Sequence, residues 1–188
     1  MGSIPIGATI FSQSYVAMTY TLVIIDMQAK FKASKKVHQR VLQEIELAKQ
    51  KNAGIIILEY GGHGPTNAEL LKAAYSNYTK VFRVAKGQDD GSREIANIIR
   101  IPNNKRRALL SNNLRICGVN TDACVQRTVE ALIRHYGIKT VSVIADACWT
   151  NTGHGSLNGK KFTPEFCHHS AIEYMCNLGV NIRKSKAA

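Results

Sequence analysis

The stretch "ICGVNTDACV", residues 116–125, decides the fold because it marks the passage from a buried strand to a helix. An apolar run ends at Val119, a small polar cluster follows, and "VQRTVEALIRHYG" continues with the spacing of an amphipathic helix. Cys124 lies at the entrance to that helix. Two interpretations are open, a buried packing residue or a nucleophile held at a helix start.

Apolar runs and amphipathic stretches alternate along the rest of the chain. Runs typical of buried strands are 21–28, 55–60, 80–86, 114–119, 139–149 and 180–184. Stretches with helical spacing are 37–52, 68–76, 91–100, 121–137 and 163–179. Strands separated regularly by helices form βαβ units, which place helices on both faces of a parallel sheet. We therefore predict one three-layer α/β/α Rossmann-like domain with a mainly parallel sheet of about six strands.

The start of the chain differs from the predicted domain. No charged side chain precedes Asp26, and no positive segment of the kind that opens a secretory signal is present. We expect residues 1–19 to form an N-terminal arm and residues 20–188 to form the domain. "MGS" is compatible with a cloning remnant as well as with a native start.

Composition limits the compartment and the partners. The chain has five cysteines, an odd number without a CxxC pair, which favours a reduced, cytoplasmic protein. No apolar run approaches the ~18 residues that span a bilayer, so no membrane partner is expected. The net charge is +12, but the basic clusters 30–36 and 105–107 are short and lack interleaved aromatic residues. We therefore expect no nucleic-acid partner, and a basic nucleic-acid-binding module remains an alternative.

Three reactive side chains follow strands of the predicted sheet. Asp26 ends the first strand, Lys86 ends the third, and Cys124 follows the fourth. In parallel sheets the ligand crevice lies beyond the carboxyl ends of the strands, so the three should meet at one edge. With Thr121 as the helix N-cap, the helix start and Lys86 should favour the thiolate of Cys124. Asp26 could then exchange protons with the thiol and a leaving amine, which is the apparatus of acyl transfer.

These residues also carry a family resemblance. "TLVIIDMQAKF", the lysine that closes "VFRVAK", and "ICGVNTDACV" before a helix resemble the isochorismatase-like cysteine hydrolases, which include nicotinamidases and N-carbamoyl-amide hydrolases. The resemblance covers nearly the whole chain from about residue 20. It implies that Asp26 is the general base, Lys86 the middle member and Cys124 the nucleophile. It also implies a cis peptide between Val119 and Asn120, with the N–H groups of Asn120 and Cys124 as the oxyanion hole.

The substrate pocket is less defined. The resemblance implies that Phe31 lines it, and Glu59 and His63 in "LEYGGHGPTN" are further candidates. Nicotinamidases carry a "DxH" metal motif in this loop and this chain does not, so we expect no metal and a substrate other than nicotinamide. A metal held by Glu59 and His63 in some other geometry remains an alternative. Trp149 and His154 in the loop after the fifth strand are also candidates, because binding residues favour such loops.

Other polar residues are interpreted as structural. Ser92, Thr66 or Asn67, and Thr163 are predicted helix N-caps, the last with Pro164 at the first helical position. The four cysteines other than Cys124 are expected in the core. His168 and His169 are expected on a helix surface, because adjacent helical residues point about 100° apart.

The sequence thus predicts a cysteine-dependent hydrolase of a small amide or carbamoyl C–N bond that acts through a thioester without an organic cofactor. The family implied by the resemblance often forms dimers or tetramers, so a homodimer or homotetramer is expected. Two alternatives remain: a catalytically silent member of the fold that binds a ligand or a protein, and the nucleic-acid-binding module.

Overall fold

A computed structural model describes residues 20–100, 110–151, 156–157 and 159–184. The six strands of the main sheet are β1 (Thr21–Ile25), β2 (Gly54–Tyr60), β3 (Val81–Lys86), β4 (Leu114–Val119), β5 (Val141–Trp149) and β8 (Asn181–Arg183). The helices are η1 (Ala29–Phe31), α1 (Lys35–Gln50), α2 (Ala68–Tyr75), α3 (Ser92–Arg100), η3 (Thr121–Val125), α4 (Gln126–Arg134) and α5 (Pro164–Asn177). The short strands β6 (Ser156–Leu157) and β7 (Lys160–Lys161) form a separate hairpin that was not predicted.

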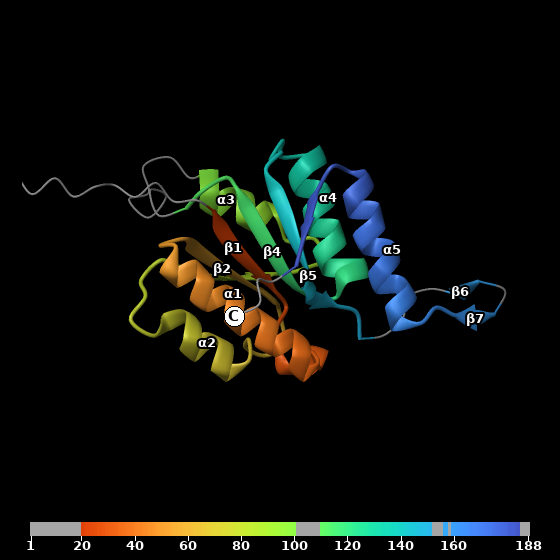
Figure 1. Ribbon diagram of the computed structural model, residues 1–188, viewed down its shortest axis with the longest axis horizontal. Coiled ribbons are helices and arrows are strands. Elements are labelled where there is room, and N and C mark those ends of the chain that lie inside the picture. The colour runs from red at the N-terminus through yellow and green to blue at the C-terminus, as the bar shows by residue number, and fades with distance from the viewer. Residues whose placement is uncertain (1–19, 101–109, 152–155, 158, 185–188) are drawn as a thin grey trace, which may run out of the picture.

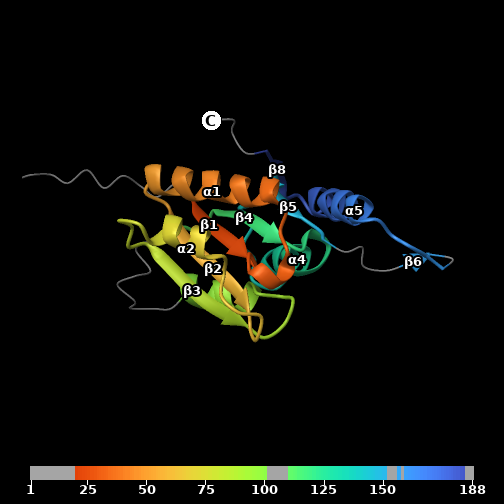
Figure 2. The ribbon, with the colours of Figure 1, turned by 90° about the horizontal axis from the view of Figure 1, so that it is seen from below.

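The sheet confirms the predicted fold class. Its strand order is β3-β2-β1-β4-β5-β8, and every neighbouring pair is parallel. Helices α1 and α2 pack together on one face (Figures 1 and 2). On the other face α4 packs against both α3 and α5 (Figure 1). The chain order reverses between β1 and β4. In open α/β sheets a crevice forms at such a reversal, beyond the carboxyl ends of the strands.

The core lies along the central strands. All of β1 is buried, as is β2 up to Glu59, because strands covered by helices on both faces have no solvent side. Gly118 on β4 faces the backbone of β1 so closely that an added Cβ would lie 2.1 Å from the Ile25 carbonyl oxygen. Its φ of 131° is also one that only glycine adopts readily. This close contact sets the path of the chain into the turn after β4.

Two of the predicted helix starts, at Asn67 and Thr163, are confirmed. The side chain of Asn67 accepts a hydrogen bond from the Glu69 N–H, and Thr163 accepts one from Phe166 with Pro164 following it. Ser92 is not the N-cap of α3. It is the first helical residue, and its own N–H donates to the Asp90 carboxylate at 2.8 Å. The Asp90 carboxylate therefore satisfies a free N–H of the first turn and complements the positive helix start.

The expectation that the four cysteines other than Cys124 lie in the core is confirmed for three of them. Cys117, Cys148 and Cys167 are buried as expected, but Cys176 is exposed near the end of α5. Within the described ranges, no helix combines the length and the hydropathy needed to cross a bilayer. The predicted N-terminal arm, residues 1–19, lies outside the described residues.

Candidate active site

The strand ends bring Asp26, Lys86 and Cys124 together. Asp26 follows β1 in a left-handed backbone conformation, with φ of 53°. Lys86 is the last residue of β3, and its Nζ crosses the end of β2 to lie 2.8 Å from Asp26 Oδ2. Both side chains are fully buried, and Cys124 is only 4% exposed. An ion pair withdrawn from water in this way interacts far more strongly than one at the surface.

Lys86 is held by more than its carboxylate partner. Its Nζ donates to the carbonyl oxygens of Gln88 at 3.1 Å and Asp89 at 3.2 Å, and lies 4.5 Å from the centre of the Tyr60 ring. Gly91 closes this loop, where a Cβ would meet the Lys86 side chain at 3.0 Å. The ammonium therefore contacts one carboxylate, two carbonyl oxygens and one aromatic ring, and these contacts fix its position beside Asp26.

The Cys124 thiol lies between two carboxylates. Its Sγ donates a hydrogen bond to Asp89 Oδ1 at 3.7 Å, and the negative charge of Asp26 acts on it from the other side, where neither Asp26 oxygen has a hydrogen-bond partner within the described residues. The other oxygen of Asp89 pairs with Arg127 Nη1 at 3.0 Å, which limits the negative charge that the sulfur meets from that side. Because its oxygens have no other hydrogen bond to accept in the described part of the chain, Asp26 is the carboxylate available to take the thiol proton.

The proton in the resting site belongs to the cysteine. Burial raises the pKa of the Cys124 thiol to about 12, and the negative charge of Asp26 adds to the rise. Burial also raises the pKa of Asp26, although the Lys86 cation opposes that rise. The prediction that the helix start and Lys86 favour a resting thiolate is therefore wrong, because desolvation and Asp26 outweigh them. Transfer of the proton from sulfur to Asp26 moves the negative charge from the carboxylate to the sulfur, so the total charge around Lys86 does not change.

The turn that carries Cys124 is wider than an α-helical turn. Residues Thr121–Val125 form a π-helical turn before α4 begins, and the Val119–Asn120 peptide bond is cis, at the position that the resemblance implies. Thr121 is not an N-cap. It is the first residue of the turn, and its hydroxyl lies 2.9 Å from Nδ1 of His168 on α5. The cap position falls to Asn120, whose carbonyl oxygen accepts from the N–H groups of Ala123 and Val125.

Two predicted pocket residues, Phe31 and His63, form an aromatic group with Tyr60. The rings of Phe31 and His63 stack with centroids 5.1 Å apart, and His63 lies 4.8 Å from Tyr60. Because the Tyr60 ring also contacts Lys86, these rings extend from the buried ion pair toward the half-buried Phe31 and His63. The side chain of Asn151 donates to the Phe31 carbonyl, which ties the loop after β5 to the same region.

Glu59 orders the loop after β2. Its Oε1 accepts from the Thr66 N–H at 2.6 Å, and its Oε2 pairs with Arg83 at 2.9 Å. Burial alone would raise the pKa of Glu59, but these hydrogen bonds and the ion pair with Arg83 hold it below its usual value. Gln28 braces the same loop by bonding both the N–H and the carbonyl of Tyr60. With both oxygens engaged, Glu59 is a structural residue rather than a group available to a substrate.

Trp149 lies in a different place from Phe31 and His63. It lines a pocket of about 370 Å³ beside α1 and α5, together with Cys148, Asp146 and His168. The prediction that His168 lies on a helix surface is wrong, since it is 7% exposed and its ring lies 5.2 Å from that of Trp149. Burial lowers its pKa, which favours the neutral ring beside Thr121. His154 lies outside the described residues.

Sequence reasoning missed Asp89, Tyr60 and His168. Asp89 and Tyr60 gave no periodic signal, because one belongs to a loop and the other ends a strand. His168 could have been found, since it lies three and seven residues before the buried Ala171 and Met175 and shares their helix face.

Comparison with known proteins rests on structure. No family model matches the sequence, and no curated protein matches it. Among solved structures, the MAR1 ribonuclease of Caenorhabditis elegans matches with a TM-score of 0.66 and 18% identity over 90% of this chain and 78% of that chain. A nicotinamidase of Staphylococcus aureus matches with a TM-score of 0.63 and 16% identity over 89% and 99%.

The YcaC gene product of Escherichia coli, described as an octameric hydrolase of unknown specificity, also matches. Its TM-score is 0.63, with 21% identity over 88% of this chain and 74% of that chain. At identities this low, the likeness establishes the fold alone. The chain has the fold of the isochorismatase-like hydrolases, as the sequence motifs predicted.

Proposed function

We propose that the protein is a cysteine-dependent hydrolase of a small amide or carbamoyl C–N bond, and that it acts through a thioester. The observation that carries the proposal is the position of the Asp26 carboxylate, which contacts the Cys124 thiol and the Lys86 ammonium in a buried site. A fold shared with a protein named a nicotinamidase, an amide hydrolase, adds support.

In the first half of the reaction Asp26 takes the thiol proton as Cys124 Sγ forms a bond to the carbonyl carbon. Negative charge collects on the carbonyl oxygen, where the N–H groups of Asn120 and Cys124 would stabilise it. When the intermediate collapses, the C–N bond breaks and the proton on Asp26 passes to the leaving nitrogen. Lys86 balances the negative charge that moves between the carboxylate and the sulfur.

In the second half water attacks the thioester. Asp26, ionised again, takes a proton from the water as its oxygen bonds to the acyl carbon. The C–S bond then breaks, the proton returns to Cys124, and a carboxylic acid leaves. Each step uses side chains of this chain and the substrate, so the cycle as written requires no organic cofactor.

The experiment is a panel of small primary amides and N-carbamoyl compounds assayed for released ammonia. We expect at least one compound to be turned over, and to leave an acyl group on Cys124 that mass spectrometry detects after acid quenching. Cys124→Ala should be inactive, while Cys176→Ala, which changes an exposed cysteine, should match the wild type. Turnover that survives in Cys124→Ala would refute the proposal.

A catalytically silent, ligand-binding protein is the second candidate, and the small exposure of Cys124 favours it. A buried thiol with a raised pKa is inert unless a substrate reaches it and a base accepts its proton. Such a protein would bind members of the panel without ammonia release.

Action on nucleic acid is a third candidate, favoured by the net charge of +12 and by the match to a protein named a ribonuclease. Fluorescence anisotropy with a labelled RNA oligonucleotide at rising salt tests it. We expect no binding at physiological ionic strength. Binding that persists there with a steep inverse dependence on salt would add a nucleic-acid function.

We also propose that the protein assembles into a homodimer or homotetramer in the cytoplasm. The octameric state described for the YcaC product supports assembly in this fold without fixing its order here. Sedimentation equilibrium measures the order directly.

A further inference from the structure

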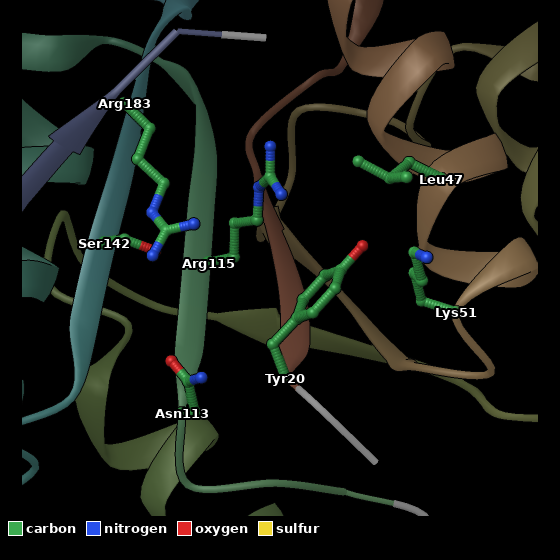
Figure 3. A pocket seen from close by; sticks show the side chains of 7 residues that line it. All are labelled: Tyr20, Leu47, Lys51, Asn113, Arg115, Ser142 and Arg183. Atoms are coloured by element: carbon green, nitrogen blue, oxygen red, sulfur yellow. The ribbon is translucent and has the colours of Figure 1, made fainter. Parts of the chain in front are cut away.

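A second pocket lies at the opposite end of the sheet from Cys124. It has a volume of about 310 Å³, and Figure 3 shows the seven residues that line it, Tyr20, Leu47, Lys51, Asn113, Arg115, Ser142 and Arg183. Tyr20 immediately precedes β1, whereas Asp26 follows it. The pocket therefore forms at the amino ends of the strands, away from the hydrolytic site. A ligand bound there would be distinct from the substrate of Cys124.

The charges around this pocket are unbalanced. Three of its lining residues are cations, and none is acidic. Arg115 pairs with Glu44 of α1 at 2.9 Å, which accounts for one positive charge. Lys51 and Arg183 are exposed and form no ion pair within the described part of the chain. Two positive charges thus border the pocket without a counter-charge, which favours an anion there.

Buried polar atoms in the pocket wall also lack partners. The Tyr20 hydroxyl and Arg115 Nε form no hydrogen bond within the described residues, although each residue is only 8% exposed. In Figure 3 the hydroxyl points toward the space between Arg115 and Leu47. Native structures leave few such groups unsatisfied, and both atoms are donors. Because burial raises the pKa of Tyr20 to about 12, with the Arg115 cation opposing the rise and Glu44 adding to it, the phenol keeps the proton that it would donate.

We propose that this pocket binds a small phosphate monoester. The phosphate would take up the unbalanced charges of Lys51 and Arg183 and accept a hydrogen bond from Arg115 Nε. The organic part would lie along Leu47 and the Tyr20 ring. A phosphate monoester carries about −1.5 to −2 charges at pH 7, which matches two unbalanced cations better than a monocarboxylate does. Guanidinium groups also suit phosphate oxygens in geometry. The volume exceeds what a bare phosphate fills, which favours an organic ester.

Isothermal titration of the full-length protein with phenyl phosphate tests the proposal. We expect a single site whose affinity falls with added salt, with benzoate at least about fivefold weaker and phenol without detectable binding. Arg183→Gln and Lys51→Gln each change an exposed residue, and each should lower the affinity for phenyl phosphate at least about fivefold. Lys160→Gln, on the β7 hairpin, removes the same charge outside the pocket and should have no effect.

Cys124→Ser in the same titration separates this site from the hydrolytic one, and it should bind phenyl phosphate as the wild type does. Affinity that is unchanged in both Arg183→Gln and Lys51→Gln, or no binding at millimolar phenyl phosphate, would overturn the proposal. Equal affinity for benzoate would overturn the assignment of phosphate. Because the readout is binding, failure of the amide hydrolase proposal leaves this test intact.

Discussion

Two buried ion pairs occupy opposite ends of the sheet, and each has a cysteine nearby. At the carboxyl ends of the strands Asp26 and Lys86 lie 2.8 Å apart beside Cys124. At the amino ends Glu44 and Arg115 lie 2.9 Å apart, and their charges act on Cys117. Burial raises the thiol pKa at both cysteines. Charge and burial alone therefore do not distinguish a nucleophile from a packing residue.

The difference lies in contact and position. Cys124 interacts with the Asp26 carboxylate and lies on a turn beyond the carboxyl end of β4, where ligands of parallel sheets bind. Cys117 lies within β4, is fully buried, and forms no side-chain hydrogen bond in the described part of the chain. A thiol becomes a nucleophile only where a base can accept its proton and a reacting carbon can reach it.

Replacing each cysteine by alanine should give the largest contrast. Cys124→Ala removes the nucleophile and should lower kcat/KM on an amide identified in the panel by at least ~10³-fold. Cys117→Ala should keep turnover close to wild type and lose about 1–2 kcal/mol of unfolding free energy, because it opens space in the core. A large loss of kcat/KM in a folded Cys117→Ala protein would break the comparison.

Neutralising the carboxylate of each pair should separate chemistry from stability. Asp26→Asn removes the proton acceptor and should lower kcat by about 10²–10⁴-fold. Glu44→Gln leaves Arg115 without its counter-charge and should lower the unfolding free energy by about 3–5 kcal/mol. Turnover per folded molecule should survive in Glu44→Gln. Urea denaturation with parallel activity assays measures both effects, and an active Asp26→Asn protein would contradict the assignment of the base.

The pairing of β1 with β4 runs between the two ends of the sheet, and a substitution at Gly118 tests how closely the two strands must approach. Gly118→Ala forces a Cβ to within 2.1 Å of the Ile25 carbonyl oxygen, so we expect a loss of more than about 3 kcal/mol of unfolding free energy. Gly137→Ala is the matched control, because its φ of 64° is also positive but no atom lies within 4 Å of the added Cβ. It should lose only about 1 kcal/mol. Equal losses would show that the close contact does not constrain the turn.

Alkaline pH should reveal the protonated thiol of Cys124 as a smaller effect. Its pKa is raised in the folded state to about 12 from the ordinary value of a cysteine near 9, so its stabilising contribution is complete below about pH 9 and is lost between about pH 9 and 12. Between pH 9.5 and 10.5, stability should fall less steeply in Cys124→Ala than in the wild type, by about 1 kcal/mol per pH unit. Identical slopes in urea denaturation would mean that the folded site does not hold this proton.

The sequence predicted the features that depend on strand ends. Parallel strands put Asp26, Lys86 and Cys124 at one edge whatever the details of packing, so their meeting followed from the order of the elements. The positions of Asp89 and Tyr60 depend on the path of the loop 87–91 and on how far the Lys86 side chain reaches, which no periodicity encodes. The prediction of a thiolate at Cys124 was wrong because the sequence shows where a helix starts but not the burial of the thiol, which outweighs the effect of the helix start.

The central claim is that the Asp26 carboxylate acts on the proton of Cys124 beside Lys86, and alkylation by iodoacetamide tests it most directly. Peptide mass spectrometry from pH 6 to 11 gives a labelling profile for each cysteine, with the exposed Cys176 as the internal reference. In the wild type, labelling of Cys124 should still be rising at pH 11, because its pKa is raised to about 12. In Asp26→Asn the midpoint for Cys124 should fall, because a negative charge that disfavours the thiolate is gone while Lys86 remains. An unchanged or higher midpoint in Asp26→Asn would contradict the claim.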